Sequence, residues 1–183
     1  SLLVLVLFSG SRWEHAQPIG ALLSHLGCLL VGVATVGRLW SSLFICGYKT
    51  DHLITAGPYA LTRNPLYLFS LAGSVGLGLA TETLTIPAIV ALAFALYYPA
   101  VIRNEEIRLL ARHGAAFSDY CATVPRFWPI RLAFIEPPLY TVVPAAYRKS
   151  MFSALLFVVL LGVLELAEGL REAHAIPTLI RLW

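Results

Sequence analysis

The stretch PIGALLSHLGCLLVGVATVGRLWSSLFI, residues 18–45, decides the fold class of this chain. Arg38 is its only formally charged residue at neutral pH. About 20 apolar residues cross the hydrocarbon core of a bilayer, so the stretch predicts a complete transmembrane helix. Arg38 lies near one end, where its long side chain can reach the interface. Gly27, Gly32 and Gly37 are expected to let neighbouring helices approach closely.

The composition of the whole chain agrees with this prediction. Of 183 residues, 58% are hydrophobic and 13% are charged, against roughly 25% charged residues in soluble domains. We therefore predict a single membrane-embedded domain over residues 1–183. The net charge of +3 does not indicate a nucleic-acid partner, because Arg and Lys gather beside the apolar runs, where membrane topology places them.

Three further apolar runs, at residues 66–80, 84–102 and 151–166, predict additional spans. The first two form a hairpin around the short turn Thr81-Glu82-Thr83, and the third follows a Pro-rich connector. Residues 2–8 are apolar but too short to cross a bilayer, and we interpret them as the tail of a truncated first helix. The prediction is an all-α, polytopic (multi-pass) membrane protein with about five transmembrane helices.

The distribution of basic residues predicts the orientation. If the spans alternate, eight basic residues fall on one side of the membrane and Arg12, Glu14 and Glu82 on the other. The side rich in Arg and Lys is normally cytosolic, which predicts a cytosolic cap over residues 103–150. The eight residues are Arg63, Arg103, Arg108, Arg112, Arg126, Arg131, Arg148 and Lys149.

The first polar cluster lies in residues 52–67, HLITAGPYALTRNPLY. Pro65 suits the first turn of a helix, and Asn64 before it is a plausible N-cap. Arg63 is unexpected here, because a cation is disfavoured at a helix N-terminus. It therefore calls for an anionic partner, either a carboxylate of the protein or a ligand. Gly57-Pro58-Tyr59 predicts a turn that returns the chain to the membrane.

The second polar cluster is Glu105-Glu106, at the end of the run 84–102. Adjacent residues on a helix point about 100° apart, so one carboxylate can face inward while the other faces water. One interpretation is a solvated face on which Glu105 pairs with a basic residue one turn later, Arg108 or Arg112. The other is a buried glutamate, which needs a cation: Arg63, Arg126 or the ammonium group of a cofactor.

Metal-binding patterns are absent from the sequence. His52 and His113 have no metal-ligand spacing with each other or with the carboxylates. Cys28, Cys46 and Cys121 fit neither a zinc site nor a disulfide framework. We predict no metal, and we interpret Cys121 as a packing residue because no base accompanies it.

Taken together, the polar motifs resemble those of a known superfamily. Residues 52–67 resemble the signature H-x-L-V-T-x-G-P-Y-x-x-x-R-H-P-x-Y of the isoprenylcysteine carboxyl methyltransferase and phospholipid methyltransferase superfamily. Glu105-Glu106 is similar to its E-E motif, and residues 117–129, FSDYCATVPRFWP, to its closing segment. The resemblance covers residues 52–129, which would be the methyltransferase-like core. Residues 130–183 would be a connector, an extra transmembrane helix and a tail.

The resemblance implies an integral membrane enzyme that uses S-adenosylmethionine in a cytosol-facing pocket. Glu106, or alternatively Glu105, would bind the amino group of the cofactor. Arg63 and Arg126 would orient an anionic part of the acceptor, and Glu105 or solvent would take a proton from an amine. Asn64 replaces the common His of R-H-P and cannot titrate. The other implied pocket residues are Tyr59, Asn64, Tyr67 and Tyr120.

The acceptor implied by the resemblance is a membrane-resident amphiphile, either a phospholipid amine or a thioether carboxylate of the prenylcysteine type. Two alternatives stay open. The segment Tyr120-Cys121-x-x-Val124-Pro125 is also similar to the endings of sterol reductases, which bind NADPH. The polar clusters could also be interface caps of a non-catalytic membrane module.

Overall fold

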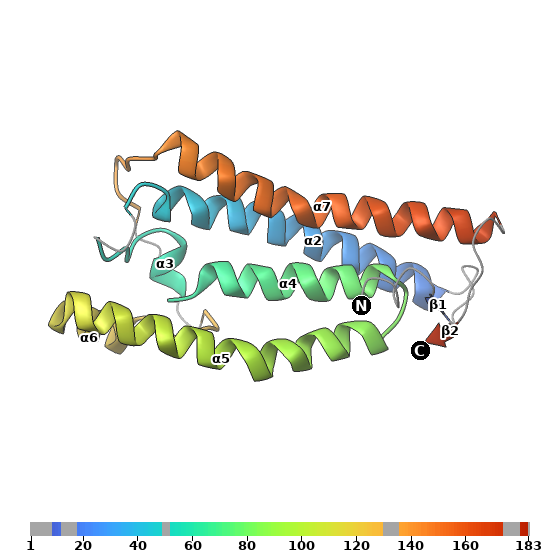
Figure 1. The fold of residues 1–183 in the computed structure, drawn as a ribbon, viewed down its shortest axis with the longest axis horizontal. Coiled ribbons are helices and arrows are strands. Elements are labelled where there is room, and N and C mark those ends of the chain that lie inside the picture. The colour runs from blue at the N-terminus through green and yellow to red at the C-terminus, as the bar shows by residue number, and fades with distance from the viewer. Residues whose placement is uncertain (1–8, 12–17, 49–51, 130–135, 174–179, 183) are drawn as a thin grey trace. The chain divides into compact units, whose positions relative to one another are not determined.

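The computed structural model describes residues 9–11, 18–48, 52–129, 136–173 and 180–182. The chain is helical, as predicted, except for two three-residue strands that pair in parallel, with Ser9 opposite Ile180 (Figure 1). The elements in chain order are β1 (Ser9–Ser11), α2 (Pro18–Ile45), α3 (Pro58–Leu61), α4 (Pro65–Ala80), α5 (Thr85–His113), α6 (Ala115–Thr123), α7 (Pro144–Glu172) and β2 (Ile180–Leu182).

Within the described ranges, three helices are long and apolar enough to cross a membrane: α2, α5 and α7. They expose large apolar side chains such as Leu22, Leu96 and Phe152, which is the surface that lipid covers in a membrane protein. Helix α4 has 16 residues and is therefore about 24 Å long, shorter than the hydrocarbon core of about 30 Å. The truncated first span lies outside the described residues, so five spans remain a prediction.

The chain forms two compact units, and each long helix contributes to both. Unit 1 comprises residues 1–35, 71–93 and 155–183. In it, α2 and α4 meet through glycine: a Cβ on Gly27 would lie 2.6 Å from the carbonyl oxygen of Gly76 and 2.5 Å from the backbone nitrogen of Ala80. Among the described residues nothing lies within 4 Å of such a Cβ on Gly32, so the close approach predicted at that position does not occur between them.

Unit 2 comprises residues 36–70 and 94–154. Gly37 packs against the ring of Phe69. Arg38 was predicted to reach the membrane interface. In the structure its guanidinium group donates to the hydroxyl groups of Ser70 on α4 and Ser153 on α7. The connector packs on the end of α2: the rings of Phe44 and Tyr140 stack with centroids 4.8 Å apart.

Helix α5 ends as the sequence predicts, because Gly114 adopts a φ of +53° that favours glycine. Helix α6 follows at once. Helix α7 begins earlier than the predicted run 151–166, at Pro144, since proline is well suited to a first helical turn. Arg148 and Lys149 therefore lie on the exposed first turns of α7 and not in the connector.

Candidate functional site

The start of α4 is tied to the loop after α6, and both belong to unit 2. The backbone N–H of Arg63 donates to the carbonyl oxygen of Pro125 at 2.9 Å. The side-chain amide of Asn64 and the hydroxyl of Thr62 both donate to the carbonyl oxygen of Arg126, at 2.8 and 3.3 Å. Asn64 stands at the predicted N-cap position, because its carbonyl oxygen accepts from the backbone N–H of Leu68 at 3.1 Å. Its side-chain amide, however, holds the loop after α6.

Glu106 is the centre of the charged cluster. Its Oε1 lies 2.9 Å from Nη1 of Arg63, and the two side chains are 17% and 15% exposed. Arg126 donates to the same carboxylate through Nε at 3.1 and 3.2 Å and through Nη2. Arg63 and Arg126 were both considered as partners for a buried glutamate. Both of them pair with Glu106. The hydrogen bond to Glu106 raises the pKa of Arg126, which stays charged.

Glu105 has a different environment on the same helix. Its Oε2 accepts a hydrogen bond of 3.0 Å from the hydroxyl of Tyr67. The pairing with Arg108 or Arg112 considered from the sequence does not occur, and within the part of the chain that the structure describes Glu105 has no ion pair. The carboxylates of Glu105 and Glu106 are both half-buried. Neither is fully solvated.

Tyr59 and Tyr120 join α3 to α6. The hydroxyl of Tyr120 donates to the carbonyl oxygen of Tyr59 at 2.7 Å. Burial raises the pKa of both phenols, so both keep their protons at neutral pH. Gly57 precedes α3 with a φ of +61°, and a Cβ there would lie 2.3 Å from the ring of Phe44. Only glycine fits this turn, which fixes the position of Tyr59.

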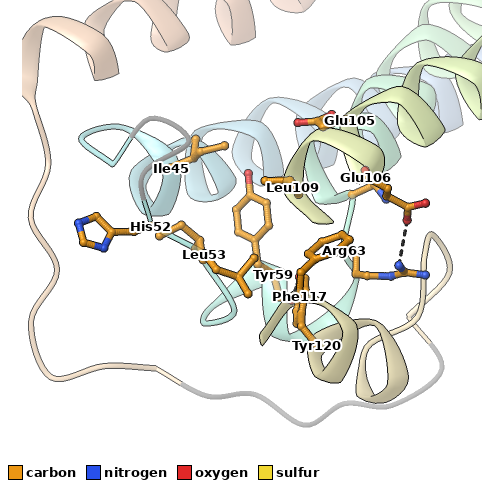
Figure 2. Close-up of a pocket in the computed structure, with 12 residues that line it drawn as sticks. Ile45, His52, Leu53, Tyr59, Arg63, Glu105, Glu106, Leu109, Phe117 and Tyr120 are labelled. Atoms are coloured by element: carbon orange, nitrogen blue, oxygen red, sulfur yellow. Dashed lines mark hydrogen bonds and ion pairs between the residues drawn. The ribbon is translucent and has the colours of Figure 1, made fainter. Parts of the chain in front are cut away.

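These residues surround a cavity of about 400 Å³ in unit 2, within the usual size range of small-molecule sites. Figure 2 shows its lining, with Glu106 and Arg63 joined by their ion pair. The polar end is formed by Arg63, Asn64, Glu105 and Glu106. The remaining lining residues are Ile45, His52, Leu53, Ile54, Tyr59, Leu109, Phe117 and Tyr120.

The structure thus gathers the residues singled out from the sequence. Six of them line the cavity directly, and Tyr67 and Arg126 adjoin it through Glu105 and Glu106. The apolar lining was not predicted. Leu109 could have been found, because it lies three and four residues after the two glutamates and so shares their helix face. Ile45 and Leu53 carry no comparable signal in the sequence.

Cys121 contacts the charged cluster, but the described cysteine and histidine residues do not form a metal site. Cys121 Sγ lies 2.7 Å from Nη1 of Arg63, so the cysteine interpreted as a packing residue contacts the charged cluster. Over the described residues, no group of three or more His, Cys, Asp or Glu side chains lies close enough together to hold a metal ion.

Comparison with known families identifies the relationship. The family model described as phospholipid methyltransferase matches residues 17–115, more than half of the chain. The chain belongs to the phospholipid methyltransferase family. The match includes the segment 52–67 and both glutamates, starts well before His52, and ends before the segment 117–129. No solved structure shows significant similarity to this family member.

Two relatives of this phospholipid methyltransferase family member have names that refer to metals. The nickel-cobalt-cadmium resistance protein NccN of Alcaligenes xylosoxydans xylosoxydans is 40% identical over 183 residues, which is the whole chain and 85% of the relative. The cobalt-zinc-cadmium resistance protein CzcN of Cupriavidus metallidurans is 39% identical over 181 residues, 99% of the chain and 83% of the relative.

Proposed function

We propose that this protein transfers a methyl group from S-adenosylmethionine to an amphiphile resident in the membrane. The acceptor would be a phospholipid amine or a thioether carboxylate. The observation that carries the proposal is a cavity with one charged and one apolar end, built from the motifs of a methyltransferase family. The cofactor has the same division, since it joins a zwitterionic amino acid to a nucleoside.

The charged end fits the amino-acid part of the cofactor. Nε of Arg63 is buried and has no hydrogen-bond partner among the described residues, so it can donate to a carboxylate. Among the described residues Glu105 has one hydrogen bond and no ion pair, so it can accept from an ammonium group. Glu106 is already held by two arginines. We therefore assign the ammonium group to Glu105, and to Glu106 the positioning of Arg63.

The chain would act mainly by positioning. S-adenosylmethionine supplies a methyl group on a sulfonium, which a nucleophile displaces in line. The residues of the cavity would orient the two reactants and exclude water. Arg126 is 48% exposed and stays protonated, so it can orient an anionic part of the acceptor. With Glu105 engaged by the ammonium group, an amine acceptor would release its proton to solvent, and a carboxylate acceptor would need no base.

The proposed orientation places this cavity on the cytosolic side of a multi-pass protein. In support, Arg63, Arg103, Arg108, Arg112, Arg126, Arg148 and Lys149 all belong to unit 2, together with the cavity. Arg12, Glu14 and Arg131 lie outside the described residues. An amphiphilic acceptor would reach the cavity from the bilayer, while the polar cofactor would enter from the cytosol.

Ligand binding to detergent-purified protein tests the proposal. We expect S-adenosylhomocysteine to bind and NADPH not to bind in calorimetric titrations. Arg63→Ala should weaken S-adenosylhomocysteine about ten- to hundredfold, the effect of losing a charged hydrogen bond. Arg103→Ala, which removes an exposed arginine of α5, is the matched control. Binding of NADPH alone would support the reductase interpretation, and binding of neither ligand the non-catalytic one.

The names of the relatives suggest a physiological setting. We propose that methylation of a membrane amphiphile contributes to resistance against divalent metals. Cells expressing the wild-type protein should then tolerate cobalt, nickel or cadmium better than cells expressing Glu105→Gln at the same level. Equal tolerance of the two strains would separate any resistance role from methyl transfer.

A further inference from the structure

Tyr59 is held in a fixed position in the lining of the cavity. Its carbonyl oxygen accepts the hydrogen bond from Tyr120, and Pro58 before it is fully buried. Gly57 makes the preceding turn against the ring of Phe44. Only 8% of Tyr59 is exposed. The backbone of this residue therefore has little freedom to carry its side chain elsewhere.

The hydroxyl of Tyr59 is an exception to a general rule. Buried polar atoms in proteins almost always have a hydrogen-bond partner. Yet this hydroxyl is buried and has none among the residues that the structure describes. In Figure 2 it points toward Ile45 and Leu109, two residues of the cavity lining. An unpaired donor directed at the wall of a cavity suggests that a ligand supplies the missing partner.

The surroundings of this hydroxyl indicate the chemistry of that ligand. Ile45 and Leu109 lie nearest to the hydroxyl in Figure 2, and the cavity lining also contains the apolar side chains of Leu53, Ile54 and Phe117. A charged group would lose its hydration there without compensation. A flat heterocycle suits such a wall, because it combines apolar faces with nitrogen atoms at its edge that hydrogen-bond.

We propose that the hydroxyl of Tyr59 hydrogen-bonds the heterocyclic base of the nucleoside ligand and so sets the direction in which that ligand lies. This inference rests on the proposed function. The base occupies the apolar end of the cavity, and the amino-acid part meets Arg63 and Glu105 at the other. Because the hydroxyl is enclosed, a rotamer change of Ile45 or Leu109 has to open access to it.

Two ligands and two variants test this assignment by calorimetry on the purified full chain. S-adenosylhomocysteine carries both the base and the amino-acid part, whereas 5′-methylthioadenosine carries only the base. Tyr59→Phe should weaken both ligands by the same factor, about three- to tenfold, as expected for one neutral hydrogen bond. Glu105→Gln should weaken only S-adenosylhomocysteine. Tyr97→Phe, which removes an exposed hydroxyl of α5, is the matched control and should change neither affinity.

Thermal unfolding separates a ligand-binding role from a structural one. Removing a buried hydroxyl that has no partner among the described residues should leave the melting temperature of Tyr59→Phe unchanged or slightly higher. Wild-type affinity of Tyr59→Phe for both ligands would overturn the assignment. A loss confined to S-adenosylhomocysteine would also overturn it, by moving Tyr59 to the amino-acid end. If the wild-type protein binds neither ligand, the proposed function fails as well.

Discussion

The two ends of α4 belong to different units and differ in how completely their polar and packing contacts are satisfied. In unit 1 the helix meets α2 through Gly76 and Gly27, where backbone atoms fill the space that side chains would need. In unit 2 the helix begins beside Arg63, whose guanidinium group has one buried donor without a hydrogen-bond partner in the described part of the chain. The end in unit 1 is closely packed. The end in unit 2 has a hydrogen-bond donor that a ligand could use. This difference separates a structural contact from a candidate site.

The largest expected effect breaks the structural contact. Gly27→Leu should lower the free energy of unfolding by about 3 kcal/mol or more, because its side chain collides with the backbone of Gly76 and Ala80. Thermal unfolding in detergent measures this loss. Gly32→Leu places its Cβ where no described residue lies within 4 Å and should leave stability nearly unchanged. Equal losses in the two variants would show that the close contact is not what stabilises α4.

The next effect is expected at the candidate site. Glu106→Gln removes the charge that holds Arg63 and Arg126. We expect S-adenosylhomocysteine to bind about ten- to hundredfold more weakly, because Arg63 would no longer be held in place for its charged hydrogen bond to the ligand, which contributes about 1.5–3 kcal/mol. Glu136→Gln, on the exposed connector, is the control. A folded Glu106→Gln protein with wild-type affinity would reduce this cluster to a structural ion pair.

A smaller effect is expected where the loop after α6 is fastened. Asn64→Ala removes the 2.8 Å hydrogen bond to the carbonyl oxygen of Arg126. Stability should fall by about 1 kcal/mol, as measured by thermal unfolding. Asn104→Ala, an exposed change on α5, should have no effect. A loss of ligand affinity larger than the loss of stability would give Asn64 a direct role in the cavity.

The smallest effect is expected at Arg126, which is 48% exposed. Arg126→Ala should weaken S-adenosylhomocysteine by less than about fivefold at low salt, because exposed ion pairs contribute at most about 1 kcal/mol. The difference from wild type should vanish at about 1 M salt, where charges are screened within about 3 Å. A defect that persists at high salt would assign Arg126 a buried contact with the ligand.

Much of this architecture could be predicted from the sequence. Residues 18–45 match α2, and Gly114 marks the end of α5 as expected. The need of Arg63 for an anionic partner followed from its place at a helix start. Helix phase alone could not decide between Glu105 and Glu106, because the partner arginine comes from a loop twenty residues later. The strand pair and the apolar cavity wall depend on contacts between distant segments, which periodicity does not report.

The short length of α4 has a consequence for the lipids around it. A bilayer that accommodates a helix of about 24 Å as a span has to thin locally, or its lipids have to tilt, at a modest cost for each ångström of mismatch. The helix begins at Pro65, next to the charged end of the cavity. Such thinning would bring lipid headgroups closer to the cavity, so an amphiphile could reach it without being lifted out of its leaflet.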